Sequence, residues 1–426
     1  MNTLKILTAI LIAIGLWGCK KDNTLKDVTN ELYSPALKSL RNNRQVVLQW
    51  QKPWCPFECP QFAPDRFEIL MSNTDPSRLQ LQATVTGNVF SFTINSLTNG
   101  TPYYFAIKAV GDNKKPALSN TIMIIPGNAE RIETILPVAS KSREQATWSS
   151  DRLTVAYTSE YTWNNGNNSS QSIFMYSLAN NTERLIEKGS RSPEWSPTQQ
   201  KIAYHTDNGE INTSQGYRPT HIAVYNIQDS TIERLTRGNS FNFLPTWSPD
   251  GKWIAFLSDR AGSKEYNVWK VPADNSTAIQ ITKDLNDFTE MEGKDSRSPK
   301  SLSWSKDGSR IAFGLLRKFK GQNDYDIYTV PANGGNKTTV ISSRWNDFCP
   351  AYSPDGITIA FVSDRSGSNE IWTMNLLTGK FKQITGSTGK WIYENRGKIE
   401  WSATGNKILF IGDAGAVNTL YTVDVN

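Results

Sequence analysis

The sequence predicts an all-β protein in which the part after residue 130 forms a six-bladed β-propeller. One short phrase, an aromatic residue followed by Ser and a tight turn, occurs six times, beginning at Trp148, Trp195, Trp247, Trp304, Tyr352 and Trp401. Successive copies lie 47 residues (148 to 195) to 57 residues (247 to 304) apart. A period near fifty built from short β-rich pieces is typical of radial repetition. No segment of comparable length has the 3.6-residue period of a helix, which favours strands throughout.

Each repeat divides into four expected strands. The first ends at the aromatic residue and Ser, and a turn such as 249–251 (Pro-Asp-Gly) follows, in which Gly supplies positive φ and Asp bonds its own backbone. In this copy the second, third and fourth strands are expected around 254–256, 268–269 and 280–282. The repeat aromatics are predicted to pack between blades.

The fourth strand is present only five times downstream of residue 148. A sixth copy lies upstream, in residues 132–136, and a ring that takes strands from both chain ends leaves no open sheet edge. We therefore predict a propeller over residues 130–426 that is closed by strand 132–136.

The repeats resemble the WD-like propeller repeats of the TolB family. Residues 247–260 and 352–367 are the clearest copies, with Ser-Pro-Asp-Gly at the turn and Ser-Asp-Arg after the second strand. The resemblance covers roughly residues 130–426 and implies the fold. It does not imply one activity, because such repeats serve scaffolds, peptidase gates and sugar lyases alike.

Residues 1–19 have the features of an export leader. Lys5 is followed by an apolar run over 6–16, which is too short to span a bilayer permanently. Residues 16–19 (Leu-Trp-Gly-Cys) resemble a lipobox, which implies cleavage before Cys19 and lipidation of that residue. We expect an outer-membrane lipoprotein on the periplasmic side or the cell surface, with residues 20–31 as a flexible tether. An ordinary secretory signal or a transmembrane helix is the alternative.

Residues 32–127 read as a separate unit. A strand over 46–50 ends in Trp50, and residues 97–105 carry Leu, Gly, Tyr and Phe at the spacing Leu-x-x-Gly-x-x-Tyr-x-Phe. This pattern resembles the fibronectin type III domain, an all-β sandwich. The resemblance implies that Tyr103 is the corner tyrosine, whose hydroxyl bonds back to the backbone. Breakers at 126–128 mark the linker to the propeller.

The remaining cysteines fall in two settings. Cys55 and Cys59 lie in a proline-rich insertion, where a loop-stapling disulfide is expected outside the cytoplasm. Free thiols or a metal site are the alternatives. Cys349 aligns with Leu244 of an earlier repeat and is expected to be a small buried hydrophobe rather than a nucleophile.

Little in the sequence points to catalysis. The net charge of +6 is spread over 426 residues, so a nucleic-acid partner is not expected. The two histidines, His205 and His221, flank one loop of one blade, and no Gly-x-Ser-x-Gly elbow or phosphate loop is present. We predict no catalytic residue, no metal ligand and no cofactor. The repeated pairs Asp259-Arg260 and Asp364-Arg365 are expected to orient the loop between second and third strands, with ligand binding as the alternative.

The long connections indicate a binding face. They join second to third strands or one blade to the next, and both kinds emerge at the same end of a propeller. Aromatic side chains among amides suit peptide or glycan recognition, and the candidate contacts are Trp163, Trp345, Trp391 and Tyr393. Solvated loops without a partner are the alternative.

Together these features predict a non-enzymatic cell-envelope binding or scaffold module for a protein or glycan, which meets the membrane through its lipid anchor only. The alternative is a carbohydrate-active lyase or hydrolase, or a peptidase-related propeller enzyme, in which carboxylates serve as acid and base.

Overall fold

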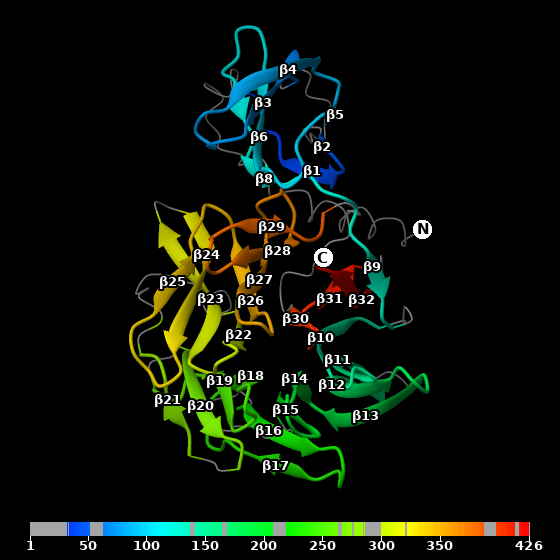
Figure 1. Cartoon of the computed structure of the whole chain (residues 1–426), viewed down its shortest axis with the longest axis vertical. Coiled ribbons are helices and arrows are strands. Elements are labelled where there is room, and N and C mark those ends of the chain that lie inside the picture. The colour runs from blue at the N-terminus through cyan, green and yellow to red at the C-terminus, as the bar shows by residue number, and fades with distance from the viewer. Residues whose placement is uncertain are drawn as a thin grey trace, which may run out of the picture. The chain divides into compact units, whose positions relative to one another are not determined.

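The computed structural model of the chain describes residues 32, 34–51, 63–136, 141–163, 168–207, 219–262, 266–274, 277–283, 285, 300–319, 322–386, 398–413 and 417–425 (Figure 1). Every regular element in these residues is a β-strand. Within the same residues, no helix is long and apolar enough to cross a membrane. They form two compact units. The first takes its residues from Met1–Leu37, Trp50–Phe90 and Phe105–Thr121, and the second takes them from Lys38–Gln49, Ser91–Tyr104 and Ile122–Asn426.

The first unit is built on an antiparallel sheet in the order β4-β3-β6-β7. Its strands are β3 (Arg66–Ser72), β4 (Gln80–Thr86), β6 (Tyr103–Val110), whose first two residues belong to the second unit, and β7 (Ala117–Leu118). The ring of Phe67 on β3 meets Trp50 edge-on, with the ring centroids 5.4 Å apart, and meets Phe90 at 5.9 Å. These contacts give the unit an aromatic core.

The second unit contains a small sheet ahead of the propeller. Its strands are β1 (Leu37–Asn42), β2 (Gln45–Trp50) and β5 (Ser91–Ile94), in the order β1-β2-β5, and β8 (Ile122–Ile124) follows further along the chain. The hydroxyl of Tyr103 accepts a hydrogen bond from the Thr98 N–H at 3.1 Å, the corner bond expected for this tyrosine. Residues 32–127, predicted as one domain, are thus divided between the two units.

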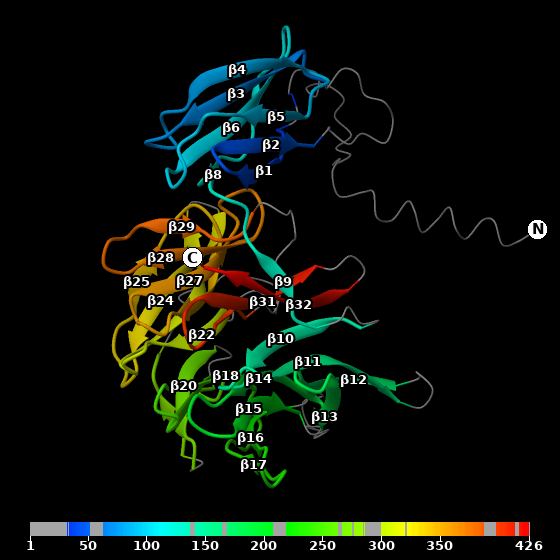
Figure 2. The ribbon, with the colours of Figure 1, turned by 45° about the vertical axis from the view of Figure 1, so that its right-hand side comes forward.

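Six four-stranded antiparallel sheets make up the rest of the second unit (Figures 1 and 2). The first strands of neighbouring sheets contact one another in chain order, and β10 also contacts β31 and β32 of the last sheet, so the ring is closed. The blades are, in order, β10 (Arg143–Trp148), β11 (Thr154–Trp163), β12 (Asn168–Ser177), β13 (Thr182–Lys188); β14 (Ser190–Trp195), β15 (Lys201–Thr206), β16 (His221–Asn226), β17 (Ile232–Arg234); β18 (Asn242–Trp247), β19 (Trp253–Ser258), β20 (Asn267–Pro272), β21 (Ile279–Gln280); β22 (Lys300–Trp304), β23 (Arg310–Phe319), β24 (Gln322–Pro331), β25 (Thr338–Ile341); β26 (Asp347–Tyr352), β27 (Thr358–Ser363), β28 (Glu370–Asn375), β29 (Phe381–Gln383); and β30 (Glu400–Trp401), β31 (Lys407–Asp413), β32 (Asn418–Asp424), β9 (Ile132–Thr134).

The sixth blade takes its outer strand from the start of the propeller. β9 pairs antiparallel with β32, with Thr134 opposite Tyr421 and Ile132 opposite Val423. Lys407 reinforces this seam, because its Nζ lies 2.7 Å from Glu133 and 3.0 Å from Asp424. The sequence predicts an outer strand over 132–136, and the structure pairs the first three of those residues.

The Ser-Pro-Asp-Gly turns have a repeated hydrogen-bond pattern. In the third blade the Ser248 hydroxyl donates to Asp250 Oδ1 at 2.5 Å and accepts the Trp253 N–H at 2.9 Å. Gly251 takes φ +70°, which favours glycine. The Ser248 hydroxyl, followed by the Lys252 N–H, lowers the pKa of Asp250. The carboxylate therefore holds the turn, as the sequence predicts.

Five of the innermost strands carry a bulge that the sequence does not reveal. The pairing register with the second strand shifts at the bulge, and one residue there has a φ between 47° and 55°: Gln145, Ser192, Leu244, Ser301 and Cys349. A bulge bends a strand and re-aims its side chains. Cys349 is 3% exposed and occupies the same bulge position as Leu244, which confirms its predicted buried role.

Candidate functional site

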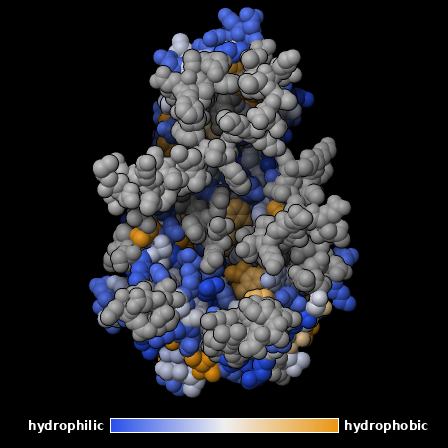
Figure 3. Space-filling model, turned by 180° about the vertical axis from the view of Figure 1, so that it is seen from behind, coloured by the Kyte–Doolittle hydropathy of each residue, from blue (hydrophilic) through white to orange (hydrophobic). Residues whose placement is uncertain are grey.

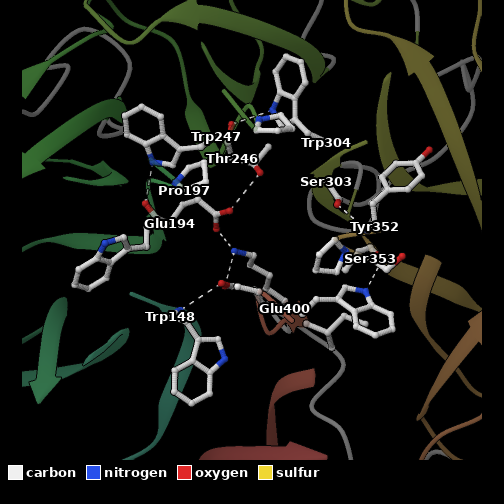
Figure 4. Close-up of a pocket in the computed structure, with 18 of the residues that line it drawn as sticks. Trp148, Glu194, Pro197, Thr246, Trp247, Ser303, Trp304, Tyr352, Ser353 and Glu400 are labelled. Atoms are coloured by element: carbon white, nitrogen blue, oxygen red, sulfur yellow. Dashed lines mark hydrogen bonds and ion pairs between the residues drawn. The ribbon is translucent and has the colours of Figure 1, made fainter. Parts of the chain in front are cut away.

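A cavity of about 290 Å³ opens where the first strands end (Figure 4). All six blades contribute to it, because each first strand ends in a repeat aromatic and the adjoining Ser turn lines the wall. The aromatics are Trp148, Trp195, Trp247, Trp304, Tyr352 and Trp401. We call this space the channel cavity.

Hydrogen bonds between blades hold three of these indoles. The Nε1–H of Trp247 donates to the Glu194 carbonyl at 3.0 Å, that of Trp304 to the Thr246 carbonyl at 3.2 Å, and that of Trp401 to the Ala351 carbonyl at 2.9 Å. Each acceptor is the residue just before the repeat aromatic of the preceding blade. The prediction that these aromatics pack between blades is confirmed for the three.

The pattern fails at two neighbouring junctions. Within the described residues, the Nε1 atoms of Trp148 and Trp195 have no hydrogen-bond partner, although both are shielded from solvent. Both residues line the channel cavity, and Trp195 is only 6% exposed. Because these two N–H groups have no accessible surface, they are buried donors behind the cavity wall and do not face the open cavity.

A charged cluster lies in the cavity. The Lys398 ammonium forms ion pairs with Glu194 and, at 3.2 Å, with Glu400. Glu194 Oε1 also accepts the Thr246 hydroxyl at 3.4 Å, and Glu400 Oε1 accepts the Trp148 backbone N–H at 3.4 Å (Figure 4). The side chain of Glu194 is 14% exposed, that of Lys398 19% and that of Glu400 23%. Two carboxylates thus share one cation in a place where water is largely displaced, which strengthens the attraction.

Sequence reasoning missed this cluster. Lys398 and Glu194 are 204 residues apart, and neither residue type is unusual in its repeat. The available signal was the position before the repeat aromatic, which holds Glu194 and Glu400 in two blades and small or hydroxyl residues in the other four. Arg152 and Lys306 also line the cavity, and the Arg152 guanidinium donates to the Thr404 hydroxyl at 2.8 Å.

Those predicted contact residues that the structure describes, Trp345 and the backbone of Trp163, belong to the other end of the blades. Trp163 is the last residue of β11, and the other end of this strand pairs with Trp148, which lines the cavity. The side chain of Trp163 lies outside the described residues, as do Trp391 and Tyr393. Trp345 precedes β26, whose last residue, Tyr352, lines the cavity. Cys19, Cys55 and Cys59 also lie outside the described residues.

Trp345 is a half-buried packing residue in the structure. Its ring lies 5.5 Å from the Arg365 guanidinium, and its backbone N–H donates to the Ser343 hydroxyl at 3.1 Å. It also packs on the buried cluster that contains Phe361 and Trp372. Among the coloured residues in Figure 3, hydrophobic ones form separate patches between mostly hydrophilic ones.

The repeated Asp-Arg pairs have a wider role than the one expected. Asp364 Oδ1 accepts the Asn346 N–H at 2.9 Å, and Arg365 Nη2 lies 2.6 Å from Asp347 Oδ1. The pair therefore joins the end of the second strand to the start of the first strand, rather than ordering only its own loop. Sequence spacing does not show this, because the partners are 18 residues upstream.

The two histidines lie on paired strands. His205 on β15 is opposite Ile222, and His221 on β16 is opposite Thr206. In the part of the chain that the structure describes, no group of three or more His, Cys, Asp or Glu side chains is arranged to hold a metal ion.

Two protein-family models match parts of the propeller. The family model of the TolB beta propeller domain matches residues 296–426, and that of the dipeptidyl peptidase IV (DPP IV) N-terminal region matches residues 212–318. The chain contains a TolB-like β-propeller domain. Its six four-stranded sheets agree with this all-β assignment.

Two curated relatives are similar over parts of the chain. The protein TolB homolog of Chlorobium luteolum is 29% identical over 175 residues, which is 40% of this chain and 34% of that protein. The uncharacterized protein Atu1656 of Agrobacterium fabrum is 27% identical over 165 residues, 38% of this chain and 48% of the relative. The chain thus spans between a third and a half of the length of these relatives. The solved structure of putative TolB from Agrobacterium tumefaciens has a TM-score of 0.48 and 16% identity, and covers 70% of this chain and 100% of its own.

Proposed function

We propose that the protein is a non-enzymatic binding module of the cell envelope that holds a protein or glycan partner on its TolB-like propeller. The observation that carries this proposal is the channel cavity, where aromatic side chains from all six blades surround a few polar groups. Apolar and aromatic walls with a small number of placed polar groups are typical of binding pockets. Residues far apart in sequence converge there, so one partner contacts the whole ring.

The location is part of the same proposal. The lipobox-like residues 16–19 support lipidation at Cys19 and attachment to the outer membrane, on the periplasmic side or the cell surface. Residues 32–127 are proposed to be a fibronectin type III domain, and the Tyr103–Thr98 hydrogen bond supports this. A Cys19→Ser variant is expected to leave the membrane fraction. Unchanged partition into membranes would contradict the anchor.

The charged cluster supports binding over catalysis. Glycoside hydrolysis needs two carboxylates that flank the reacting bond, one as acid and one as base. Glu194 and Glu400 instead share Lys398, which occupies the space between them. Incubation with pectic oligosaccharides and with peptides, with and without divalent metal, tests the enzymatic alternative. If turnover is found and Glu194→Gln abolishes it, the enzymatic alternative replaces our proposal.

The two ends of the propeller give two surfaces that one experiment separates. A cavity variant, Glu194→Gln with Trp148→Phe, is compared with a long-loop variant, Trp163→Ala with Trp391→Ala and Tyr393→Ala. Partner recovery from envelope extracts is measured for both and for the parent chain, together with melting temperature. We expect the cavity variant to lose the partner while it stays folded, and the long-loop variant to keep it. The reverse result would return the binding face to the long loops.

Trp345 is a control that distinguishes a packing residue from a contact residue. Because it packs on Arg365 and a buried cluster, Trp345→Ala is expected to lower the melting temperature before it changes partner recovery. A loss of partner at an unchanged melting temperature would make Trp345 a contact residue instead.

A further inference from the structure

The strand β4 is an open edge of the sheet in the first unit. It stands at the end of the order β4-β3-β6-β7 and, among the described residues, pairs with β3 alone. Five of its seven residues are exposed and none is buried, and Leu81 is 60% exposed. The free side of an edge strand presents backbone N–H and C=O groups, which are a template for a further strand.

β4 also lacks the charges that usually protect such an edge. Its sequence is Gln-Leu-Gln-Ala-Thr-Val-Thr, without a charged residue. Charged side chains on an edge strand, or a segment that covers it, discourage pairing with another chain. The outer strand of the first blade, β13, has the same length and four charged residues: Glu183, Arg184, Glu187 and Lys188. β1, an edge of the small sheet, is partly covered, because the Arg41 backbone N–H donates to the Gly386 carbonyl at 3.0 Å. β4 has neither form of protection.

The pairing of β4 with β3 shows which part of the edge is regular. Gln82 is an extra residue, because Ala83 is opposite Ile69 whereas Leu81 is opposite Leu70. The bulge leaves residues 83–86 in regular register. A strand that joins β4 antiparallel is therefore expected to pair around Thr84, since this residue lies within the regular part and is exposed.

A second copy of β4 fits this edge in charge and in side-chain size. Pairing of two copies about Thr84 brings no like charges together, because the strand has none. The same register sets Ala83 of each copy opposite Val85 of the other. Both residues are half-buried and lie opposite Ile69 and Phe67 of β3, which are buried in the core. The two pairs thus cover apolar surface that is only partly covered in one chain.

We propose that β4 pairs antiparallel with β4 of a second copy of this chain, so that the two sheets join across a two-fold axis. The inference is independent of the proposed function and uses no residue of the channel cavity. One short strand edge buries much less than the roughly 1,200 Å² of a stable interface, so we expect a weak dimer with a Kd on the order of 0.1 mM.

The test is sedimentation velocity on the full chain, from about 5 μM to about 500 μM, a range that spans this Kd. The average mass of the parent is expected to rise toward that of two chains. Thr84→Lys sets two ammonium groups opposite each other and is expected to weaken association about fivefold or more. Thr84→Glu is expected to do the same, and an equimolar mixture of the two variants should associate again. Thr182→Lys, an exposed position on β13, is the matched control and should behave as the parent.

Three results would overturn the proposal. A parent that stays a single chain over the whole range excludes the second copy as the occupant and leaves the edge to a strand of another protein. Thr84→Lys that associates as strongly as the parent places any dimer contact elsewhere. A mixture that associates no better than either variant alone excludes pairing around Thr84.

Melting temperatures show whether the variants remain folded. Thr84→Glu lies opposite Glu68 on β3, so it is the variant most exposed to like-charge repulsion. If it fails to fold, hydrogen exchange in the parent replaces the mixture. The backbone amides of residues 82–86 must then exchange more slowly at high protein concentration than at low concentration, while those of β13 do not change. Equal exchange of the β4 amides at both concentrations would exclude the pairing.

Discussion

The third and fifth blades have the same architecture at the entrance of the first strand, but they differ in charge. In both blades an Arg that follows the second strand turns back to the first residue of the first strand. Arg260 Nη2 lies 2.6 Å from Asn242 Oδ1, and Arg365 Nη2 lies 2.6 Å from Asp347 Oδ1. The Nε atoms donate to equivalent Ser hydroxyls, at 3.1 Å and 2.9 Å.

The aromatic surroundings of the two guanidiniums also match. Arg260 lies 5.0 Å from the Phe256 ring and 5.2 Å from the Trp269 ring, and Arg365 lies at the same distances from Phe361 and Trp372. Arg365 has two further rings around it, Trp345 and Phe381, and is 1% exposed. The fifth blade thus buries its Arg completely and gives it a carboxylate, whereas the half-exposed Arg260 has an amide.

The comparison shows that geometry and charge are separable in a repeat. The hydrogen-bond length is the same for amide and carboxylate, so the fold fixes the position of the Arg. Burial decides whether that Arg needs a counter-charge, because an unpaired buried cation is far more costly than an exposed one. Differences between the two blades should therefore appear in energetics rather than in structure.

The largest expected difference concerns the acceptor at the first strand. Asp347→Ala leaves the Arg365 charge buried and unpaired, and we expect it to lower the free energy of unfolding by about 3–5 kcal/mol. Asn242→Ala removes a neutral acceptor from a half-exposed Arg and is expected to cost about 1–2 kcal/mol. Urea denaturation of the two variants measures the difference. Asp347→Asn, which gives the fifth blade the chemistry of the third, should fall between them, and equal losses for both Ala variants would show that burial of Arg365 has no energetic role.

The second expected difference is a pH dependence that only the fifth blade has. Glu370 begins β28 where Asn267 begins β20, and each accepts the hydroxyl of a Thr two residues after the fourth strand, at 2.5 Å for Thr385 and 3.0 Å for Thr282. Burial is the main cause that raises the pKa of Glu370 from 4.5 to about 8; nearby Glu130 adds to it, while hydrogen bonds from Thr385 and Ser368 and the charge of Arg41 oppose it. Below pH 4.5 the group is protonated in both the folded and unfolded chain, so its contribution to stability is fully present. As pH rises toward 8, only the unfolded chain loses the proton, and stability falls by at most about 1.4 kcal/mol per pH unit.

Glu370→Gln removes this titration. We expect the variant to match the parent chain near pH 4.5 and to be more stable by about 2–3 kcal/mol at pH 8, less than the ideal limit because the surroundings of a buried carboxylate relax. Stability is measured by urea denaturation at several pH values. Asn267→Asp is the matched control, and it should give the third blade a decline with pH that it lacks. A parent chain whose stability does not change between pH 5 and 8 would refute the raised pKa.

These contrasts mark the limit of the sequence analysis. The turn chemistry of Asp250 and Gly251 was predictable, because hydrogen bonding and φ are decided within five residues of chain. The outer strand at 132–136 was predictable because six repeats need six fourth strands and only five follow residue 148. The partners of Arg365 and Lys398 were not, because they depend on bulges that re-aim the first strands and on which blades face one another across the channel. A repeat pattern defines what the blades share, whereas the charged cluster of the candidate site consists of residues that they do not share.

A smaller difference is expected at the turn glycines. Gly251 and Gly356 have φ of +70° and +74°, so both Ala variants carry the same backbone strain. A Cβ at Gly251 would lie 2.0 Å from the Thr198 hydroxyl, whereas one at Gly356 would lie 3.2 Å from Lys306 Cβ. We expect Gly251→Ala to cost about 2 kcal/mol and Gly356→Ala about 1 kcal/mol, measured as the free energy of unfolding. Thr198→Ala should remove the excess in the third blade; if it does not, the difference arises elsewhere.

The smallest expected effect is one that the two blades share. Ser248 and Ser353 donate to Asp250 and Asp355 at 2.5 Å in both turns, and these hydrogen bonds, followed by those from backbone N–H groups, lower the pKa of both carboxyls. Asp250→Ala and Asp355→Ala should each lower the free energy of unfolding at pH 7 by about 1 kcal/mol or less, since both groups are near solvent.

The sign of the pH dependence is opposite to that of Glu370. A lowered folded pKa gives stability that is present above the unfolded value of 3.8 and is lost as pH falls through the folded value. The cost of each substitution should therefore shrink in acid, which urea denaturation at pH 7 and pH 3 measures. Because the turn geometry is the same in both blades, the two Ala variants should change together. A clear inequality between them would mean that the charge differences at the other end of the blades reach the turns, and that geometry and charge are not separable after all.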